Sequence, residues 1–189
     1  MPSVSLVPVI PVDDKLLSSV VTPLSMIIGI PVIIDNTNHL DPAFAFDFSR
    51  NQYNSTALIA ALVALQARQR QTCSADSAST GDKVLGITSV DLFVPVLTFV
   101  FGEAQLDGNT AIVSTYRLDE SLYGFPPNPR LTQERLLKES LHELGHTFGL
   151  IHCPDYLCVM HSSTSVEEID IKTARFCLKC QQILEKKLA

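Results

Sequence analysis

The sequence has no excess of basic residues. Its 14 Lys and Arg are outnumbered by 20 Asp and Glu, which gives a formal net charge of -6 and an isoelectric point of about 5.3. Domains that bind nucleic acid usually present a basic face to the phosphates. The composition therefore argues against a nucleic-acid partner.

The sequence also has no unbroken hydrophobic span, and we expect no signal peptide. Its first residues, Met1–Ser5, contain no basic n-region and no small-residue cleavage site, so we expect a cytoplasmic location. Residues 16–34 include no charged side chain, and a membrane helix needs about 20 such residues. Pro23, Gly29 and Pro31 interrupt this stretch, which favours a helix ending near Gly29 and a buried strand after it. We therefore expect no membrane partner.

Internal repeats and low-complexity tracts are absent from the sequence as well. A chain of 189 residues, 46% of them hydrophobic, is sufficient for one compact domain with a sizeable core. Hydrophobic periodicity and turn signals predict strands over residues 3–10, 31–34, 84–89, 96–101 and 110–115. They predict helices over residues 14–29, 54–71, 135–146 and from Glu167 or Ile171 to Lys187. This order indicates a mixed sheet with a largely parallel portion, and a turn at residues 107–109 pairs the last two strands antiparallel.

Residues 142–152 read His-Glu-Leu-Gly-His-Thr-Phe-Gly-Leu-Ile-His. Two histidines four apart on a helix lie on one face, so His142 and His146 can present nitrogens to one metal ion. Glu143 follows the first of them and can reach a water on that metal. Gly149 permits a sharp turn, which returns His152 as a third ligand. Three protein ligands leave a fourth position for water, as a catalytic zinc ion requires.

This motif predicts a zinc-dependent hydrolase of peptide bonds. Zinc lowers the pKa of its bound water from about 15.7 to about 7, and Glu143 would take the proton as general base. The full motif fixes five positions, so chance produces it in a chain of this size with a probability on the order of 10⁻⁵. The alternative is a zinc-binding interaction module with little or no turnover. The intact Glu143 favours the enzyme, because a binding module needs no base beside an open zinc position.

Four of the five cysteines lie in the last 37 residues, at positions Cys153, Cys158, Cys177 and Cys180. Two close pairs of thiolates are typical of a tetrahedral Cys₄ zinc site, which would stabilise a small region with little core of its own. Two disulfides, an iron–sulfur cluster and a redox C-x-x-C pair are the alternatives; the missing export signal disfavours the disulfides. Cys73 is expected to be an unligated thiol, and His161 a loop residue.

These motifs together resemble the archaemetzincins, a family of metzincin-clan zinc metallopeptidases. The resemblance rests on the long histidine motif joined directly to Cys153, on Cys158-Val159-Met160 and on Cys177-Leu178-Lys179-Cys180. Residues 50–53 and 99–102 also resemble segments of the family.

The resemblance implies an α+β fold of the metzincin (zincin-like) type. Residues 1–149 would form an N-terminal subdomain with a twisted mixed sheet, a backing helix and the active-site helix. Residues 150–189 would form a small zinc-stapled C-terminal subdomain, in which Met160 makes the Met-turn beneath the catalytic zinc. Two zinc ions per chain and a peptide or protein substrate are implied as well. An edge strand over residues 98–104 would border the cleft and pair with an extended peptide; the other strand order would place residues 110–115 there.

Overall fold

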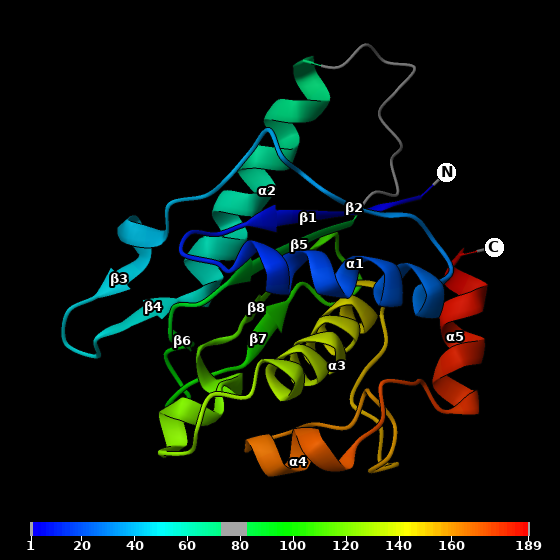
Figure 1. Cartoon of the computed structure of the whole chain (residues 1–189). Helices are drawn as coiled ribbons and strands as arrows, with labels where there is room; N and C mark the ends of the chain where they lie inside the picture. Colours follow the sequence, from blue (N-terminus) through cyan, green and yellow to red (C-terminus); the bar gives the residue numbers. More distant parts are fainter. Residues whose placement is uncertain (1, 73–82, 189) are drawn as a thin grey trace.

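A five-stranded mixed sheet forms the centre of the molecule (Figure 1). The computed structural model describes residues 2–72 and 83–188, so Cys73 lies outside the described residues. The strands are β1 (Val4–Pro8), β2 (Val32–Ile34), β5 (Lys83–Thr88), β7 (Gly102–Ala104) and β8 (Thr110–Ser114), in the order β2-β1-β5-β8-β7. The first four strands in this order are parallel, and β7 pairs antiparallel with β8. The strand β7 is therefore at the edge of the sheet.

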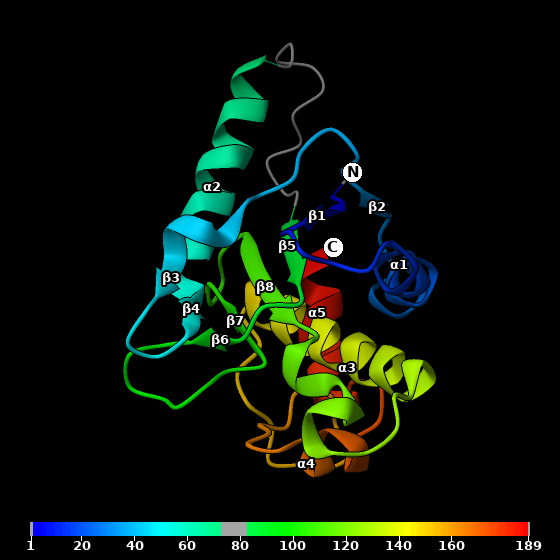
Figure 2. The ribbon, with the colours of Figure 1, turned by 60° about the vertical axis from the view of Figure 1, so that its left-hand side comes forward.

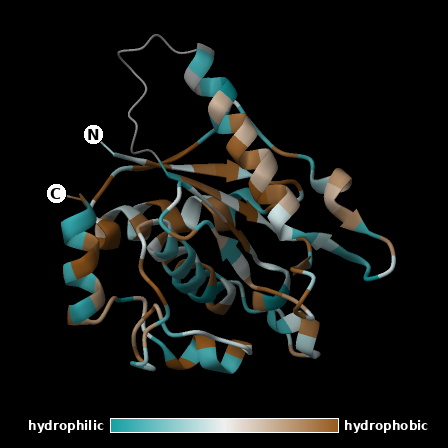
Figure 3. Cartoon of the chain, turned by 180° about the vertical axis from the view of Figure 1, so that it is seen from behind, coloured by the Kyte–Doolittle hydropathy of each residue, from teal (hydrophilic) through white to brown (hydrophobic). Residues whose placement is uncertain are grey.

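Helices cover both faces of this sheet. Figure 2 shows α2 (Ser55–Thr72) on one side, and α1 (Asp14–Ile28) with α3 (Pro129–Thr147) on the other. Alternate side chains of a strand point to opposite faces, and β8 follows this rule. Ile112 packs with the α2 side of the core, whereas its neighbours Ala111 and Val113 pack with the α1 and α3 side. The central strands are mostly hydrophobic, and the end of α2 farthest from the sheet is hydrophilic (Figure 3).

Smaller elements surround the sheet. A second sheet has the order β3-β4-β6 and consists of β3 (Phe46–Asp47), β4 (Gln52–Asn54) and β6 (Leu92–Phe93). Single 3-10 turns span Pro42–Ala45, Tyr116–Leu118 and Glu120–Tyr123. The chain ends with α4 (Val166–Ile171) and α5 (Leu178–Leu188), which lie below and beside α3 in Figure 1.

Much of the predicted architecture is confirmed. The sheet is mixed with a parallel portion, and α1 ends before Gly29, which takes a positive φ of 85° as the C-cap. Within residues 2–72 and 83–188, no helix combines the length and the apolar character that crossing a bilayer requires. The three strands of the second sheet were not predicted, because two or three residues are too few to show a period.

Three predicted boundaries are wrong. Residues 96–101 are not a strand; the strand that pairs with β8 begins at Gly102, and the segment before it is held by side chains, as described below. The helix expected from residue 135 begins at Pro129, because Asn128 caps it and a proline suits the first helical position. The single C-terminal helix is two helices, since the backbone turns extended at Lys172.

A buried arginine joins the start of α3 to two neighbouring elements. Arg135, whose side chain is 3% exposed, forms ion pairs with Glu120 at 2.6 Å and with Asp170 at 2.7 Å. It also donates to the backbone oxygen of Leu118 at 2.9 Å. The hydrogen bonds that Arg135 donates to the carboxylate of Asp170 raise the pKa of Arg135, so its charge is retained.

We expect Arg135→Ala to lower the free energy of unfolding by about 1.5–3 kcal/mol, because two carboxylates that are 20% and 36% exposed and the carbonyl of Leu118 then lose their charged donor. Urea titration followed by circular dichroism measures this change. Arg130→Ala is the control, since Arg130 is 89% exposed and pairs with Glu134 on its own helix. Equal stability of the Arg135 variant and the wild type would contradict the assignment.

Candidate active site

The helix α3 places His142 and His146 one turn apart on the same face. Nδ1 of His142 lies 2.8 Å from the backbone oxygen of Val159, and Nδ1 of His146 lies 2.7 Å from that of Leu150. A carbonyl oxygen only accepts hydrogen bonds, so Nδ1 carries the proton in each ring and Nε2 keeps a free lone pair. The two Nε2 atoms lie 3.1 Å apart. The chain thus aims two lone pairs at one point.

A sharp turn after α3 brings His152 to the same place. Gly149 adopts a φ of 83°, a left-handed conformation that glycine takes without a Cβ clash. The ring of His152 lies 5.2 Å from that of His142 and 5.0 Å from that of His146, measured between centroids. Each histidine offers a ring nitrogen to a group in which the nitrogens all lie within 4.8 Å of one another.

This donor set has the dimensions of a zinc site. Zinc–nitrogen bonds of about 2.0–2.1 Å in a tetrahedron separate the nitrogens by about 3.4 Å, close to the 3.1 Å between the Nε2 atoms of His142 and His146. Burial lowers the pKa of all three imidazoles. The rings are therefore neutral near pH 7, which is the form that binds a metal ion.

Glu143 is buried between α3 and the edge strand β7. A Cβ at Gly102 of β7 would lie only 2.9 Å from Oε1 of Glu143 and 2.6 Å from the backbone oxygen of Ile112. Only glycine leaves room for the carboxylate at this point. Burial, followed by the charge of Glu139, raises the pKa of Glu143 well above its ordinary value, so this carboxylate is a stronger base than one in water.

Met160 lies against the helical turn that carries the two histidines. Its side chain is fully buried, and a Cβ added at Gly145 of α3 would overlap its sulfur atom. The backbone oxygen of Met160 accepts a hydrogen bond from the N–H of Cys153 at 2.9 Å. Sequence reasoning expected Met160 near the histidine site, and the structure brings it there. His161, expected to be a loop residue, contacts the oxygen of Cys153 through Nδ1 at 2.9 Å.

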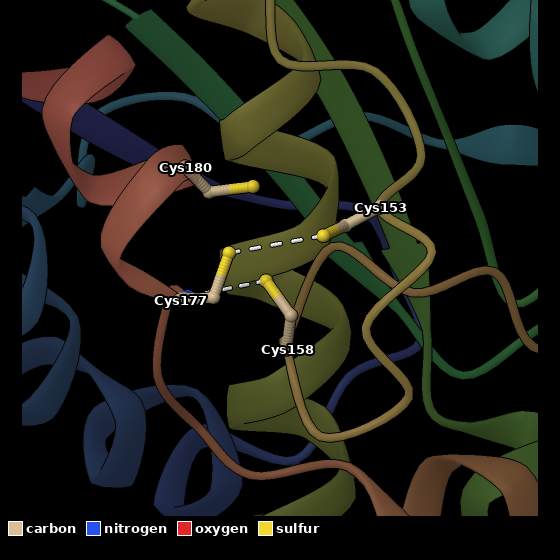
Figure 4. Close-up of side chains that lie close together, drawn as sticks. All are labelled: Cys153, Cys158, Cys177 and Cys180. Carbon is tan, nitrogen blue, oxygen red and sulfur yellow. Dashed lines mark hydrogen bonds between the residues drawn. The ribbon is translucent and has the colours of Figure 1, made fainter.

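The four C-terminal cysteines form a second cluster (Figure 4). All four are free, and Sγ of Cys153 lies 3.8 Å from Sγ of Cys177, far beyond the roughly 2.05 Å of a disulfide. Zinc–sulfur bonds of about 2.3 Å in a tetrahedron separate the sulfurs by about 3.8 Å. Burial raises the pKa of the Cys158 and Cys180 thiols, whereas the backbone N–H of Cys180 lowers that of Cys177. The cluster therefore fits a tetrahedral metal ion, which would stabilise the thiolates.

A cleft of about 660 Å³ lies in front of the histidines. Residues 97–104, which include β7, form one wall, and α3, His152 and residues 162–164 form the others. Of the two strands considered for this border, β8 is excluded because it lies between β5 and β7. The free edge of β7 is available to pair with an extended chain.

Sequence reasoning missed a buried ion pair beside the cleft. Nζ of Lys172 lies 2.8 Å from Oε1 of Glu139, and the two side chains are 0% and 4% exposed. The pair is close although its atoms are not aligned for a hydrogen bond, which Lys172 donates instead to the oxygen of His161 at 3.2 Å. Glu139 lies on α3 at helical spacing from His142 and Glu143 and was detectable in the sequence. Lys172, distant in sequence, had no such signal.

The close packing of Gly145 against Met160 gives a testable prediction. Alanine is favoured over glycine inside a helix by about 1 kcal/mol, but overpacking a filled core costs about 1–3 kcal/mol. We expect Gly145→Ala to lower the thermal unfolding midpoint, measured by circular dichroism, because its Cβ meets Met160. Glu134→Ala on the exposed side of α3 is the control. A midpoint at or above that of the wild type would contradict the packing argument.

Residues 24–186 match the model of peptidase family M54. An archaemetzincin of Methanocaldococcus jannaschii is 38% identical over 178 residues, which cover 94% of this chain and 90% of that protein. An archaemetzincin of Pyrococcus furiosus is 41% identical over 144 residues, 76% of this chain and 70% of that protein. A zinc-dependent peptidase of Methanocorpusculum labreanum superposes with a TM-score of 0.87 at 31% identity, covering 96% of this chain and 99% of that chain. The archaemetzincin of Methanopyrus kandleri superposes with a TM-score of 0.78 at 36% identity, covering 98% and 94%. The predicted metzincin-like fold is confirmed, and the chain belongs to peptidase family M54, the archaemetzincin family of zinc metallopeptidases.

Proposed function

We propose that the chain hydrolyses peptide bonds at a zinc ion held by His142, His146 and His152, with Glu143 as the general base. The observation that carries this proposal is the convergence of three imidazoles beside a buried carboxylate in an open cleft, with the Nε2 lone pairs of His142 and His146 free. The zinc-dependent peptidase of Methanocorpusculum labreanum, similar over 96% of this chain, supports the same function.

The chain's own groups divide the work of the reaction. When bound, zinc supplies the Lewis acidity that brings the pKa of a coordinated water to about 7. The edge of β7 holds the peptide extended through backbone hydrogen bonds. Glu143, next to Gly102 of that strand, takes the proton of the water and delivers it to the leaving amine.

We further propose that the four cysteines hold a second, structural zinc ion. Four thiols with the sulfur spacing of a tetrahedron leave no open position for water. Such an ion would join the loop after α3 to the start of α5, in a C-terminal subdomain of residues 150–189 with little core of its own. Met160, packed between this region and α3, would support the catalytic histidines. Free thiols that serve as ligands also favour a reducing, cytoplasmic location.

Replacing the base should strongly reduce hydrolysis without removing the metal. General-base catalysis contributes about 10²–10⁴-fold, so we expect Glu143→Ala to lower kcat/KM by about that factor and to keep its zinc content. A quenched-peptide library measures cleavage, and elemental analysis measures zinc. Glu134→Ala on the same helix is the control. Undiminished cleavage by Glu143→Ala would contradict this mechanism, and a zinc-loaded wild type that cleaves no peptide would point to a binding module.

The two metal sites should differ in how readily they lose zinc. His152 is exposed and its site keeps an open position, whereas three of the four cysteines are buried. We expect two zinc ions per chain, of which a chelator removes first the one required for activity, with activity restored by added zinc. Cys180→Ser should retain about one zinc ion and unfold at a lower temperature. Elemental analysis after dialysis measures the zinc content of the wild type and of the variant, and circular dichroism measures the unfolding temperature. One zinc ion or none in the wild type would contradict the two-site proposal.

A further inference from the structure

Residues 94–101 are not a strand, and the second half of this segment forms a wall of the cleft. They run from the end of β6 to the start of β7, and the cleft is lined by the part from Leu97 onwards. The segment makes only sparse backbone bonds to its neighbours, such as the bond from the N–H of Val100 to the oxygen of Leu92 at 3.0 Å. Its conformation therefore depends on side chains.

One arginine donates two of the side-chain hydrogen bonds that hold this segment. Nη2 of Arg50, between β3 and β4, donates to the backbone oxygens of Leu97 at 2.7 Å and Thr98 at 3.0 Å. Its Nε donates to Oε1 of Gln52 at 3.1 Å, and its guanidinium lies 4.3 Å from the centroid of the Phe93 ring. Neither Leu97 nor Thr98 belongs to a strand. Arg50 therefore donates the hydrogen bonds that a neighbouring strand would otherwise supply to their backbone oxygens.

Gln52 extends this arrangement into the molecule. Its side chain is only 6% exposed, and its Nε2 donates to the oxygen of Thr98 at 3.0 Å and to Oδ2 of Asp91 at 2.9 Å. Asp91 in turn pairs through both oxygens with Arg117, at 2.6 and 2.7 Å. The guanidinium of Arg117 lies 4.0 Å from the centroid of the Phe99 ring, which faces the cleft. Gln52 therefore holds the backbone of the wall at Thr98, and Arg117 supports the ring of Phe99.

The chemistry of arginine suits this task better than that of lysine. The planar guanidinium reaches two carbonyls and an amide at once while it stacks on an aromatic ring, whereas an ammonium is a single point charge. Hydrogen bonds from a charged donor are about twice as strong as neutral ones. Figures 1 and 2 both show β4 and β6 near β7, so the second sheet acts as a bracket for the edge strand.

We propose that Arg50, together with Gln52, is a positioning residue for the substrate. It holds residues 97–101 so that an extended peptide can pair with β7 while large apolar side chains of the peptide contact Leu97 and Phe99. The inference rests on the proposed peptidase function. Leu97 and Phe99 line the cleft, and their apolar surface defines the class of peptide that the wall accepts. Arg50 itself touches no reacting atom.

The test compares Arg50→Gln and Arg50→Lys with Arg130→Gln, a matched loss of an exposed arginine outside the cleft. Steady-state kinetics use an eight-residue peptide rich in Phe and Leu. Inhibition by acetohydroxamate, a small metal-binding group too short to reach the wall, is measured in parallel. We expect Arg50→Gln to raise KM about tenfold, the equivalent of one charge-assisted hydrogen bond. Its kcat should stay within about twofold, with inhibition by acetohydroxamate unchanged.

Arg50→Lys keeps the charge but places all its N–H donors on one nitrogen, so a rise in KM of about threefold is expected. It carries the test if Arg50→Gln does not fold. Arg130→Gln should match the wild type. Unchanged KM in the Arg50 variants would overturn the inference, and so would a fall in kcat alone, which indicates a smaller active fraction from a merely structural role. A wild type that cleaves no peptide would overturn the proposed function itself and, with it, the inference. Cleavage by the wild type with equal KM in all variants would overturn the inference only.

Discussion

The hydrogen bonds from Nδ1 of His142 and His146 to backbone oxygens are the constraint on which the site depends. They fix the tautomer and the rotation of each ring, so that both Nε2 atoms face one point. One acceptor, Val159, lies between Cys158 and Met160, in the segment that also provides the cysteine cluster. The two candidate metal sites are therefore mechanically joined, and disorder at the cysteines would misorient a histidine ring.

Burial of charge is the main cost of this arrangement. Glu143 and the Glu139–Lys172 pair are removed from water within two turns of α3, and desolvating each ion costs several kcal/mol before pairing offsets it. Lys172, at the end of α4, partly compensates for two neighbouring carboxylates, since its charge lowers the pKa of Glu143 against the larger effect of burial. The C-terminal region thus contributes a charge to the site as well as a support for its histidines.

The cleft shows a different use of polar groups. The wall before β7 leaves carbonyls outside any ladder, and Arg50 and Gln52 bind them from the second sheet. Two of these hydrogen bonds come from a charged donor, which makes them stronger than bonds between neutral groups, so they favour the conformation that the wall takes. Side chains, and not another strand, hold the residues before β7. The outer edge of β7 therefore stays available to a substrate.

The sequence alone determined the local chemistry, and the tertiary structure decided what surrounds it. Helical spacing is a property of consecutive residues, so the placement of His142, Glu143 and His146, and the turn at Gly149, followed directly from the motif. The strand expected at residues 96–101 lies instead at Gly102–Ala104, because Arg50, distant in sequence, holds the preceding carbonyls. Lys172 beside Glu139 was equally out of reach. Such contacts join residues that only the folded chain brings together, whereas the spacing of ligands on one helix follows from their sequence interval as soon as that helix forms.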